Sequence, residues 1–284
     1  MNVCIVLVTY NRLEYTRKCI SRLLEDYTQE FDLYLWDNAS RDETPGYLNS
    51  IKDPRIVEII LSKENVGQTG AMNYVWSKTK AELVGKVDND CLVTPGWTRI
   101  LAKAHEDIEK LGAVACWHFF PEDFDYELAK HKIQTFNGHQ IFRHPYVGGT
   151  GLLLKRRTFL EMGSWDKGPN VGTTYYFLKM ALAGYINGWY YPLVYQEHMD
   201  DPVSDQSMLK DDKAINSLYD ITYTLRNRKI KTMEKRMAWR RHVIRELLCG
   251  PWEPRYYVGW RSKLCRIKKR VTDLFSSKPS CNLK

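Results

Sequence analysis

Short apolar runs alternate with segments of helical spacing along the N-terminal part of the chain. The apolar, β-branched runs predict strands at residues 3–8, 31–36, 56–61 and 82–87. The segments between them predict helices at residues 16–24, 42–51 and 70–78. Strands that alternate with helices form a parallel sheet through right-handed crossovers, with helices on both faces. The sequence therefore predicts an α/β fold.

The same alternation continues less regularly after the fourth strand. Helices are predicted at residues 96–111 and 172–183, a short helix ending at Met162, and strands at residues 113–117, 152–154 and 189–195. Residues 118–145 are rich in Asp, His and aromatic side chains and show no regular period. We expect an irregular segment there.

From Lys210 onward only helical spacing remains. Apolar side chains at steps of three and four form three stripes, which we interpret as packing surfaces rather than a cofactor site. Their members are Ile215, Leu218, Tyr219, Thr222 and Leu225; Ile230, Met233, Met237, Ile244 and Leu248; and Tyr257, Trp260, Leu264, Ile267, Val271 and Leu274. The sequence therefore predicts a C-terminal helical extension.

Charge is distributed unevenly along the 284 residues. The net charge is +8, but residues 226–270 hold 16 lysines and arginines against three acidic residues, so the rest of the chain is net acidic. Such a block predicts an anionic partner, either a phosphate backbone or a lipid surface. A solvated helical face is the alternative.

Cysteine spacing and hydropathy exclude several classes of protein. The seven cysteines are scattered without a Cys-x-x-Cys pair, so neither a zinc site nor a redox dithiol is predicted. No apolar run approaches the roughly 20 residues of a membrane span, and no leader peptide is indicated. We expect a reduced cytoplasmic protein without a transmembrane helix, peripheral to a membrane surface if the basic block binds lipid.

Three polar clusters directly follow predicted strands. They are residues 9–12, residues 37–40 and Asp88-Asn89-Asp90. Ligands of parallel sheets bind beyond the carboxyl ends of the strands, so one pocket can collect all three clusters. Two carboxylates separated by one residue can hold a divalent cation, which in turn neutralises a diphosphate. A turn or a helix cap is the alternative for such a triplet.

Two glycine-rich nucleotide motifs are missing from the sequence. Residues 148–151 (Gly-Gly-Thr-Gly) are not followed by a Lys-Ser or Lys-Thr pair, which excludes a Walker-type phosphate loop. No Gly-x-Gly-x-x-Gly follows the first strand, which argues against a dinucleotide enzyme.

Four motifs together resemble, in order and spacing, the signatures of family 2 glycosyltransferases with the GT-A fold. They are Val-Thr-Tyr-Asn-Arg at residues 8–12, Trp-Asp-Asn-Ala-Ser-Arg-Asp at residues 36–42, Asn-Val-Gly at residues 65–67 with Asn73, and Val-Asp-Asn-Asp at residues 87–90. The resemblance implies a Rossmann-like, mostly parallel sheet, a nucleotide-sugar donor that is usually a UDP-sugar, and Mn²⁺ or Mg²⁺ as cofactor.

The resemblance also implies how the chain is divided. We expect a catalytic domain at residues 1–205, followed by the basic helical extension at residues 206–275 and a flexible tail at residues 276–284. Within the catalytic domain, residues 1–95 would form the nucleotide-binding half, and residues 96–205 the half for the acceptor and the donor sugar.

Individual roles follow from the same resemblance. The metal site is expected to consist of Asp88, Asp90 and His198. Asp90 would bind the ion directly, whereas Asp88 would bind the ribose or contact the ion indirectly. Alternatively, Asp37 and Ser40 only cap the helix at Asp42, and His198 is a packing residue. The donor is expected to contact Thr9, Tyr10, Asn11, Arg12, Asp37, Asn65, Gly67, Asn73, Asp88, Asn89, Gly148 and Gly149.

One departure from the family pattern concerns the general base. Inverting members usually carry an acidic pair where this chain has Gly172-Thr173-Thr174, and threonine cannot deprotonate an acceptor hydroxyl at neutral pH. Three explanations stay open: another carboxylate is the base, the reaction retains configuration, or the protein binds nucleotides without catalysis. Asp200 and Asp201 rank above Asp166 as the base, because they closely follow His198.

The sequence leaves the acceptor between two classes. Aromatic side chains interleaved with the basic block can stack on bases, which favours a nucleic acid. The same composition suits an anionic membrane surface, which favours a lipid-linked or cell-envelope glycan. These aromatic residues are Trp239, Trp252, Tyr256, Tyr257 and Trp260.

Overall fold

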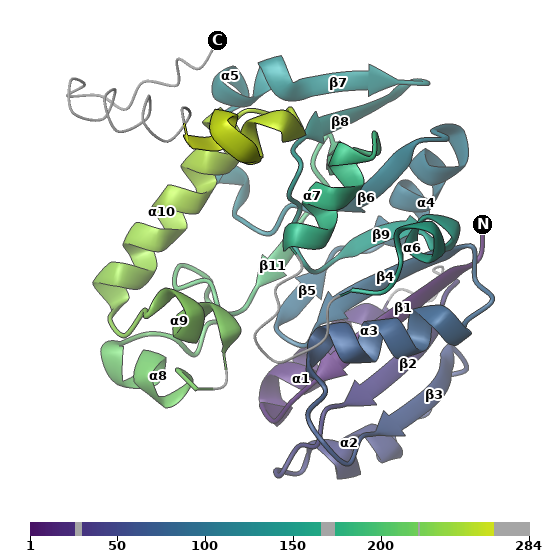
Figure 1. The fold of residues 1–284 in the computed structure, drawn as a ribbon. Coiled ribbons are helices and arrows are strands. Elements are labelled where there is room, and N and C mark those ends of the chain that lie inside the picture. Colours follow the sequence, from purple (N-terminus) through teal and green to yellow (C-terminus); the bar gives the residue numbers. More distant parts are fainter. Residues whose placement is uncertain (26–29, 166–173, 221, 264–284) are drawn as a thin grey trace.

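A nine-stranded sheet forms the centre of the computed structural model, which describes residues 1–25, 30–165, 174–220 and 222–263 (Figure 1). The strand order is β3-β2-β1-β4-β9-β6-β10-β8-β7. The strands are β1 Val3–Thr9, β2 Asp32–Asp37, β3 Ile56–Leu61, β4 Leu83–Asp88, β6 Leu111–Ala115, β7 Ile133–Phe136, β8 His139–Arg143, β9 Leu152–Lys155 and β10 Ile186–Tyr191.

The first four strands of this sheet are parallel, as their alternation with helices predicts. Parallel pairing returns between β6 and β10, whereas β9 runs antiparallel between β4 and β6. The predicted α/β fold is confirmed.

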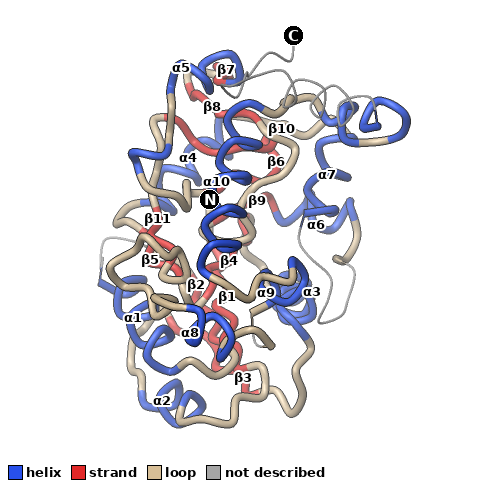
Figure 2. The backbone as a smooth tube through the Cα atoms, turned by 90° about the vertical axis from the view of Figure 1, so that its left-hand side faces the viewer, coloured by secondary structure: helices blue, strands red, loops and turns tan. Residues whose placement is uncertain are grey.

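Helices cover both faces of the sheet, and in Figure 2 α1 and α3 lie on opposite sides of β1, β2 and β4. One apolar core forms under α1, α2 and α4, where Cys19, Ile20 and Leu23 of α1 are buried at the predicted helical spacing. The other core forms under α3, α6 and α7. These helices are α1 Leu13–Glu25, α2 Thr44–Ser50, α3 Gly67–Lys78, α4 Trp97–Asp107, α6 Arg156–Met162 and α7 Thr174–Leu182.

The segment predicted to be irregular contains regular structure, so that prediction is wrong. β7 and β8 pair as an antiparallel hairpin, and the turn between them places Asn137 and Gly138 at φ values of 46° and 85°. An Asn-Gly pair adopts this left-handed conformation readily, which makes it a strong hairpin signal. Three short helices precede the hairpin or join it: η1 Pro121–Asp123, α5 Tyr126–Ala129 and η2 Lys130–Lys132.

The last predicted strand, at residues 189–195, is confirmed only up to residue 191. β10 ends at Tyr191, and after a turn the chain forms β11 Gln196–His198, which pairs antiparallel with β5 Cys91–Val93 in a separate two-stranded sheet. In this register His198 lies opposite Cys91. This small sheet therefore brings His198 next to the triplet at residues 88–90.

The helical extension begins with a small apolar cluster of its own. Ile215 and Leu225 of the first predicted stripe are buried in it, together with Leu209 and Ile230. Two short helices carry this cluster, α8 Asp212–Ser217 and α9 Tyr223–Arg228.

The long helix α10, Met233–Cys249, packs against the part of the chain that forms the nine-stranded sheet (Figure 1). Leu247 and Leu248 join the core under α3 and α7, and the ammonium of Lys132 donates a hydrogen bond to the Leu247 carbonyl. The helix is followed by η3, Pro254–Tyr257. Among the described residues, we find no helix with the length and apolarity needed to cross a membrane.

Candidate active site

The predicted polar clusters meet at the carboxyl ends of β1, β2 and β4. In the sheet register Thr9 lies opposite Asp37, and Val8 lies opposite Asp88. This is where ligands of α/β sheets bind, because the loops beyond the parallel strands leave a crevice there. The edge is therefore the candidate active site.

Asp37 holds a buried acceptor atom without a partner. Its side chain is 1% exposed, and Oδ2 accepts a hydrogen bond from the Ser40 amide at 3.0 Å, while Oδ1 has no partner. The helix α2 begins at Thr44, whose amide is bound by Asp42 at 3.1 Å, so Asp37 does not cap this helix. A buried acceptor without a partner fits a ligand that donates an N–H or O–H group.

The loop after β1 is held in an uncommon conformation. Asn11 and Arg12 have positive φ values of 54° and 64°. The Asn11 amide donates to Ser40 Oγ at 2.7 Å, and Asn11 Oδ1 accepts from the Arg41 amide at 2.9 Å. These bonds tie the loop to the one after β2, while the side chain of Tyr10 is half-buried beside them.

The side chains of the triplet at residues 88–90 have different partners. The Asn89 amide nitrogen donates to the hydroxyls of Thr9 and Thr16 at 3.2 and 3.1 Å, so it fixes the triplet to the start of α1. Asp88 forms an ion pair with the buried ammonium of Lys86, and its amide donates to Thr150 Oγ1 at 2.8 Å. Burial raises the pKa of the Asp88 carboxyl.

Asp90 and His198 come together because β11 pairs with β5. The Met199 amide donates to the Asp90 carbonyl at 2.7 Å, and His198 Nε2 lies 4.0 Å from Asp90 Oδ1. Cys91 Sγ belongs to the same cluster and lies 3.5 Å from Oδ1, but burial holds the pKa of its thiol well above the ordinary value. A carboxylate and an imidazole at this separation fit a divalent cation between them.

Asp88 does not belong to this cluster of possible ligand atoms in the described structure. Its Oδ1 is held by Lys86, which also binds Gln68 at 2.8 Å. Of the three predicted ligands, Asp90 and His198 therefore lie together, whereas Asp88 is paired with Lys86.

Both higher-ranked candidates for the general base are bound by arginines. Asp200 is 2% exposed and accepts from two nitrogens of Arg12, with Nη1 to Oδ2 at 3.0 Å. Burial by itself would raise the pKa of Asp200, but the charge and hydrogen bonds of Arg12 lower it below its ordinary value. Both carboxylate oxygens of Asp201 accept from Arg240 Nε, at 2.8 and 2.7 Å. Each carboxylate is thus occupied by a guanidinium in this structure.

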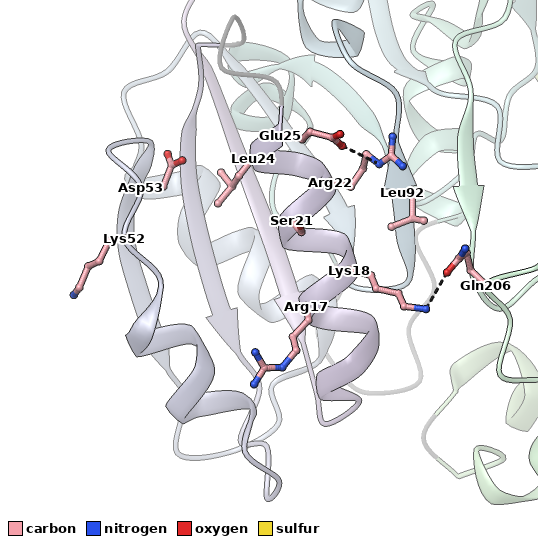
Figure 3. Close-up of a pocket in the computed structure, with 10 residues that line it drawn as sticks. All are labelled: Arg17, Lys18, Ser21, Arg22, Leu24, Glu25, Lys52, Asp53, Leu92 and Gln206. Atoms are coloured by element: carbon pink, nitrogen blue, oxygen red, sulfur yellow. Dashed lines mark hydrogen bonds and ion pairs between the residues drawn. The ribbon is translucent and has the colours of Figure 1, made fainter.

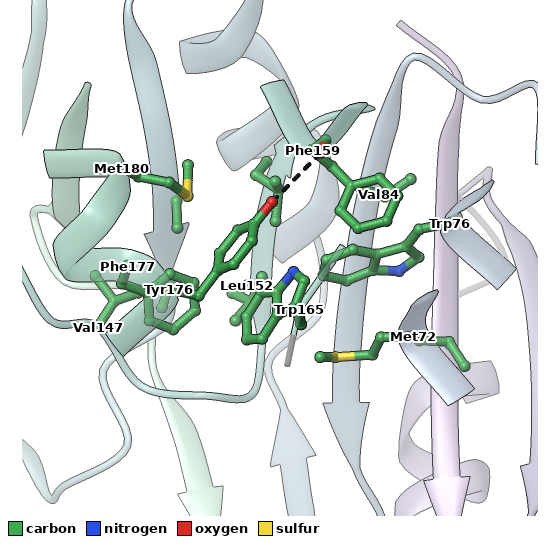
Figure 4. Packing of buried hydrophobic residues seen from close by; sticks show 14 of the residues in the cluster. Met72, Trp76, Val84, Val147, Leu152, Phe159, Trp165, Tyr176, Phe177 and Met180 are labelled. Carbon is green, nitrogen blue, oxygen red and sulfur yellow. Dashed lines mark hydrogen bonds between the residues drawn. The ribbon is translucent and has the colours of Figure 1, made fainter. Parts of the chain in front are cut away.

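The third candidate, Asp166, lies outside the described residues, as do Gly172 and Thr173. The residue before Asp166 is fixed firmly: both polar ends of the Asn73 side chain bind the backbone of Trp165, at 2.8 and 2.9 Å. The Trp165 ring lies between Trp76 and Tyr176 in Figure 4, with its centroid 4.3 Å from that of Tyr176. Asn73 thus supports the segment that leads to Asp166.

The remaining residues predicted to contact the nucleotide-sugar donor lie on either side of this strand edge. Asn65 is exposed before α3, and its Oδ1 accepts from the Gly67 amide at 2.9 Å. Gly148 lies against His118, because a Cβ atom at residue 148 would stand 2.9 Å from His118 Nδ1. Gly149 is half-buried next to it.

A sequence-family comparison decides the class of protein. The model described as "Glycosyl transferase family 2" matches residues 4–164, more than half of the chain. The chain belongs to this family.

Solved structures of similar shape agree with the fold of this glycosyltransferase. The mannosyltransferase PcManGT from Pyrobaculum calidifontis, solved with GDP-Man and Mn²⁺, matches with a TM-score of 0.59 and 17% identity, over 98% of this chain and 76% of that one. Residues 1-349 of S. aureus TarS, solved with UDP-GlcNAc, match with a TM-score of 0.54 and 12% identity, over 87% and 82% of the two chains.

A curated relative is also similar in sequence. The succinoglycan biosynthesis protein ExoO of Rhizobium meliloti (strain 1021) is 25% identical over 195 residues. These residues make up 64% of the glycosyltransferase and 56% of the relative, so the chain spans little more than half of that protein.

Two further residues of the glycosyltransferase lie at this site and were not predicted from the sequence. Arg236 of α10 donates through Nη2 to the Asp200 carbonyl at 2.9 Å. His118 follows β6, and burial lowers the pKa of its imidazole to about 3. The apolar stripe of α10 gave no sign of Arg236, because in the sequence it is one of many cations in the basic block.

A groove of the glycosyltransferase on the outer side of α1 lies apart from this edge (Figure 3). Arg17, Lys18 and Arg22 line it, and these three cations already have partners: Lys18 binds Gln206 at 2.9 Å, Arg22 pairs with Glu25 at 3.3 Å, and Arg17 lies over the Tyr47 ring. We assign no part of the reaction to this groove.

Proposed function

We propose that this family 2 glycosyltransferase moves a sugar from a nucleoside diphosphate sugar, a UDP-sugar, to an acceptor hydroxyl with the help of Mn²⁺ or Mg²⁺. The observation that carries the proposal is the approach of Asp90 and His198 to 4.0 Å at the strand edge where Asp37 leaves a buried oxygen without a partner. The structures solved with GDP-Man and with UDP-GlcNAc support a donor of this class.

In this proposal the loops after β1 and β2 hold the nucleoside. Asp37 Oδ1 accepts a hydrogen bond from the base, and the backbone of Asn11 and Arg12, fixed through Ser40, forms the wall beside it. Because Asp37 is held by the Ser40 amide, its position needs no rearrangement when the nucleoside binds.

Asp90 Oδ1 and His198 Nε2 would hold the cation, which supplies positive charge to the diphosphate. Asp90 can do so without losing its other partner, since Oδ2 lies 3.4 Å from Arg12 Nη1. His198 Nδ1 accepts from the Asp200 amide at 3.1 Å, and Nε2 therefore carries the proton in the neutral ring. If Nε2 binds the cation, the proton of the neutral ring must be on Nδ1. The Asp200 amide can then no longer donate a hydrogen bond to Nδ1.

For the acceptor, we propose a glycan carried at an anionic membrane surface. Trp260 is 65% exposed, and Arg255, Arg261 and Lys263 are exposed near it in the sequence. An aromatic ring flanked by cations binds the interface of anionic lipids. The curated relative, a succinoglycan biosynthesis protein, supports a polysaccharide product.

A nucleic acid is the second candidate acceptor. The observation that favours it is the same exposed combination of Trp260 with Arg255 and Arg261, which can also stack on bases and neutralise phosphates. The two candidates differ in what the surface must bind, so they can be separated directly.

The function is tested by incubating the full chain with Mn²⁺ and a panel of UDP-sugars and GDP-sugars. Transfer to lipid-linked glycans, DNA or RNA is scored by mass spectrometry. We expect a UDP-sugar to be consumed only when a divalent cation is present. Turnover that is equally fast in EDTA would contradict the proposed use of a metal.

A further inference from the structure

Arg236 is a buried cation that lacks most of its hydrogen bonds. The residue is 7% exposed, and its only hydrogen bond among the described residues joins Nη2 to the Asp200 carbonyl. Nε and Nη1 are buried without a partner. Because a buried donor without a partner destabilises the protein, an arginine in this state indicates a ligand that supplies the missing acceptors.

The neighbouring carboxylates do not provide the missing partners. Asp200 is bound by Arg12, and Asp201 is bound by Arg240. Arg240 also pairs with Asp123, so its own donors are used. Within the described part of the chain no carboxylate lies within ion-pair distance of Arg236, which leaves its charge available for an anion from outside.

The location of Arg236 indicates which anion that is. Arg236 binds the Asp200 carbonyl, and the Asp200 amide binds His198 Nδ1, so Asp200 connects Arg236 to the Asp90–His198 pair. His118 lies close to both Arg236 and His198, and its Nδ1 is likewise buried without a partner. Two polar side chains from separate elements thus lack partners at one place, next to the residues that fit a cation.

We propose that Arg236 binds the diphosphate of the donor, so that α10 completes the donor site. The inference rests on the proposed function, because it takes the donor to be a nucleoside diphosphate sugar. A guanidinium presents several N–H groups in a planar fork, which matches the oxygens of a phosphate. Nε and Nη1 are the two groups of this fork that are free to bind.

The same contact would act during transfer. The bond between the anomeric carbon and the diphosphate oxygen breaks, and its electron pair stays on that oxygen. The acceptor oxygen forms the new bond to the anomeric carbon and releases its proton to a base. Arg236 then faces the negative charge that develops on the leaving diphosphate, where a fixed cation stabilises the transition state more than the ground state.

The inference differs from the expectation that the basic block serves the acceptor alone. Arg236 belongs to that block, but it is buried on the side of the helix that faces Asp200. Its neighbour Arg241 is exposed on the same helix and serves as the matched control.

The test is calorimetric titration of the full chain with Mn²⁺ and either uridine or UDP, and with guanosine or GDP in parallel. Arg236→Gln is expected to weaken diphosphate binding about 10- to 100-fold, as expected for a lost hydrogen bond to a charged group, and to change nucleoside binding less than about twofold. Arg241→Gln is expected to bind like the wild type.

Two results would overturn the inference: equal diphosphate affinity in Arg236→Gln and wild type, or an equal loss of nucleoside and diphosphate affinity, which marks a purely structural role. Thermal unfolding shows whether each variant folds. If the Gln variant does not, Arg236→Lys, which keeps the charge but lacks the planar fork, must still lose affinity for the diphosphate selectively. Wild-type protein that binds neither diphosphate would instead refute the proposed function.

Discussion

Arg240 of α10 joins Asp201 and Asp123, two carboxylates from distant parts of the catalytic segment. Its Nε lies 2.8 and 2.7 Å from the oxygens of Asp201, and its Nη1 lies 3.0 Å from Asp123 Oδ1. Arg240 is buried in this arrangement, so it is a structural residue of the catalytic fold rather than a free cation for an acceptor.

The first prediction follows from that contact. Arg240→Gln leaves the buried Asp201 and the half-buried Asp123 without their counterion, and we expect the free energy of unfolding to fall by about 3–5 kcal/mol. The exposed control Arg241→Gln should change it by less than about 0.5 kcal/mol. Urea denaturation followed by circular dichroism measures both variants. Equal stability of the two would show that the buried ion pairs contribute nothing.

The second prediction concerns the cation. Asp90→Asn keeps the shape of the side chain but removes its charge, and we expect the Mn²⁺-dependent part of UDP binding to fall about 100-fold or more. This exceeds the effect of partners that only orient a metal ligand, about 10–100-fold. The exposed Asp32→Asn serves as the control in the same titrations. A variant at residue 90 that still gains affinity from Mn²⁺ would remove Asp90 from the ligands.

The third prediction separates the candidates for the general base. Asp201→Asn should lower the stability by about 3–5 kcal/mol, because Arg240 loses a buried counterion, while the kcat of the folded enzyme falls less than about tenfold. Asp166→Asn is expected to show the opposite pattern, with unchanged stability and kcat lowered about 100-fold or more. A folded Asp201→Asn variant without turnover would make Asp201 the base.

The fourth prediction is a dependence of stability on pH. His105 is fully buried and Nε2 lies 3.1 Å from the Leu153 carbonyl, and burial lowers the pKa of its imidazole to about 3. Between that value and the ordinary value of about 6.5, the unfolded chain binds a proton that the native protein does not. Stability is therefore full above about pH 6.5 and is lost as the pH falls, by up to about 1.4 kcal/mol per pH unit from this residue.

His105→Gln removes that contribution, so the slope of unfolding free energy against pH should become shallower by about this amount between pH 6 and 5. The exposed His242→Gln variant should keep the wild-type slope. Urea denaturation at pH 7, 6 and 5 gives the comparison. Parallel slopes for all three proteins would mean that His105 is protonated in the native state.

The fifth prediction distinguishes the two acceptors. We substitute the exposed cations Lys235, Arg241, Arg261 and Lys263 by Gln in one variant. For a nucleic acid, each lost phosphate contact should flatten the slope of log affinity against log salt by roughly 0.7–0.9. For a membrane-borne acceptor, binding to anionic vesicles should weaken and binding to DNA should be weak in both proteins. If acceptor binding is insensitive to salt and is the same in the variant and the wild type, these cations form only a solvated helical face.

The order of the elements in the first half of the fold was predictable because each strand and helix there has a clear local period. The predicted strand at residues 56–61 matches β3 residue for residue, and the ends of β1, β2 and β4 differ from the prediction by one residue. The polar clusters were predictable for the same reason, since strand ends and parallel pairing determine where Asp37 and Asp90 lie.

The second half was less predictable because its contacts are between distant segments. The position of β9 between β4 and β6, and the pairing of β11 with β5, leave no local pattern in four- and three-residue strands. The hairpin of β7 and β8 did carry a local signal, Asn137-Gly138, which the composition of the surrounding segment obscured. Arg236 and Arg240 are buried by tertiary contacts that a helical charge pattern cannot show.

The pairing of Arg12 with Asp200 has a consequence for biosynthesis. The two residues are separated by 188 positions, and Asp123 is separated from Arg240 by 117. A ribosome releases residues in order, so a nascent chain with its first strands already folded still lacks Asp200 as the second partner of Arg12 and Arg240 as the partner of Asp123. The ion pairs at this end of the sheet are therefore complete only after α10 has left the ribosome.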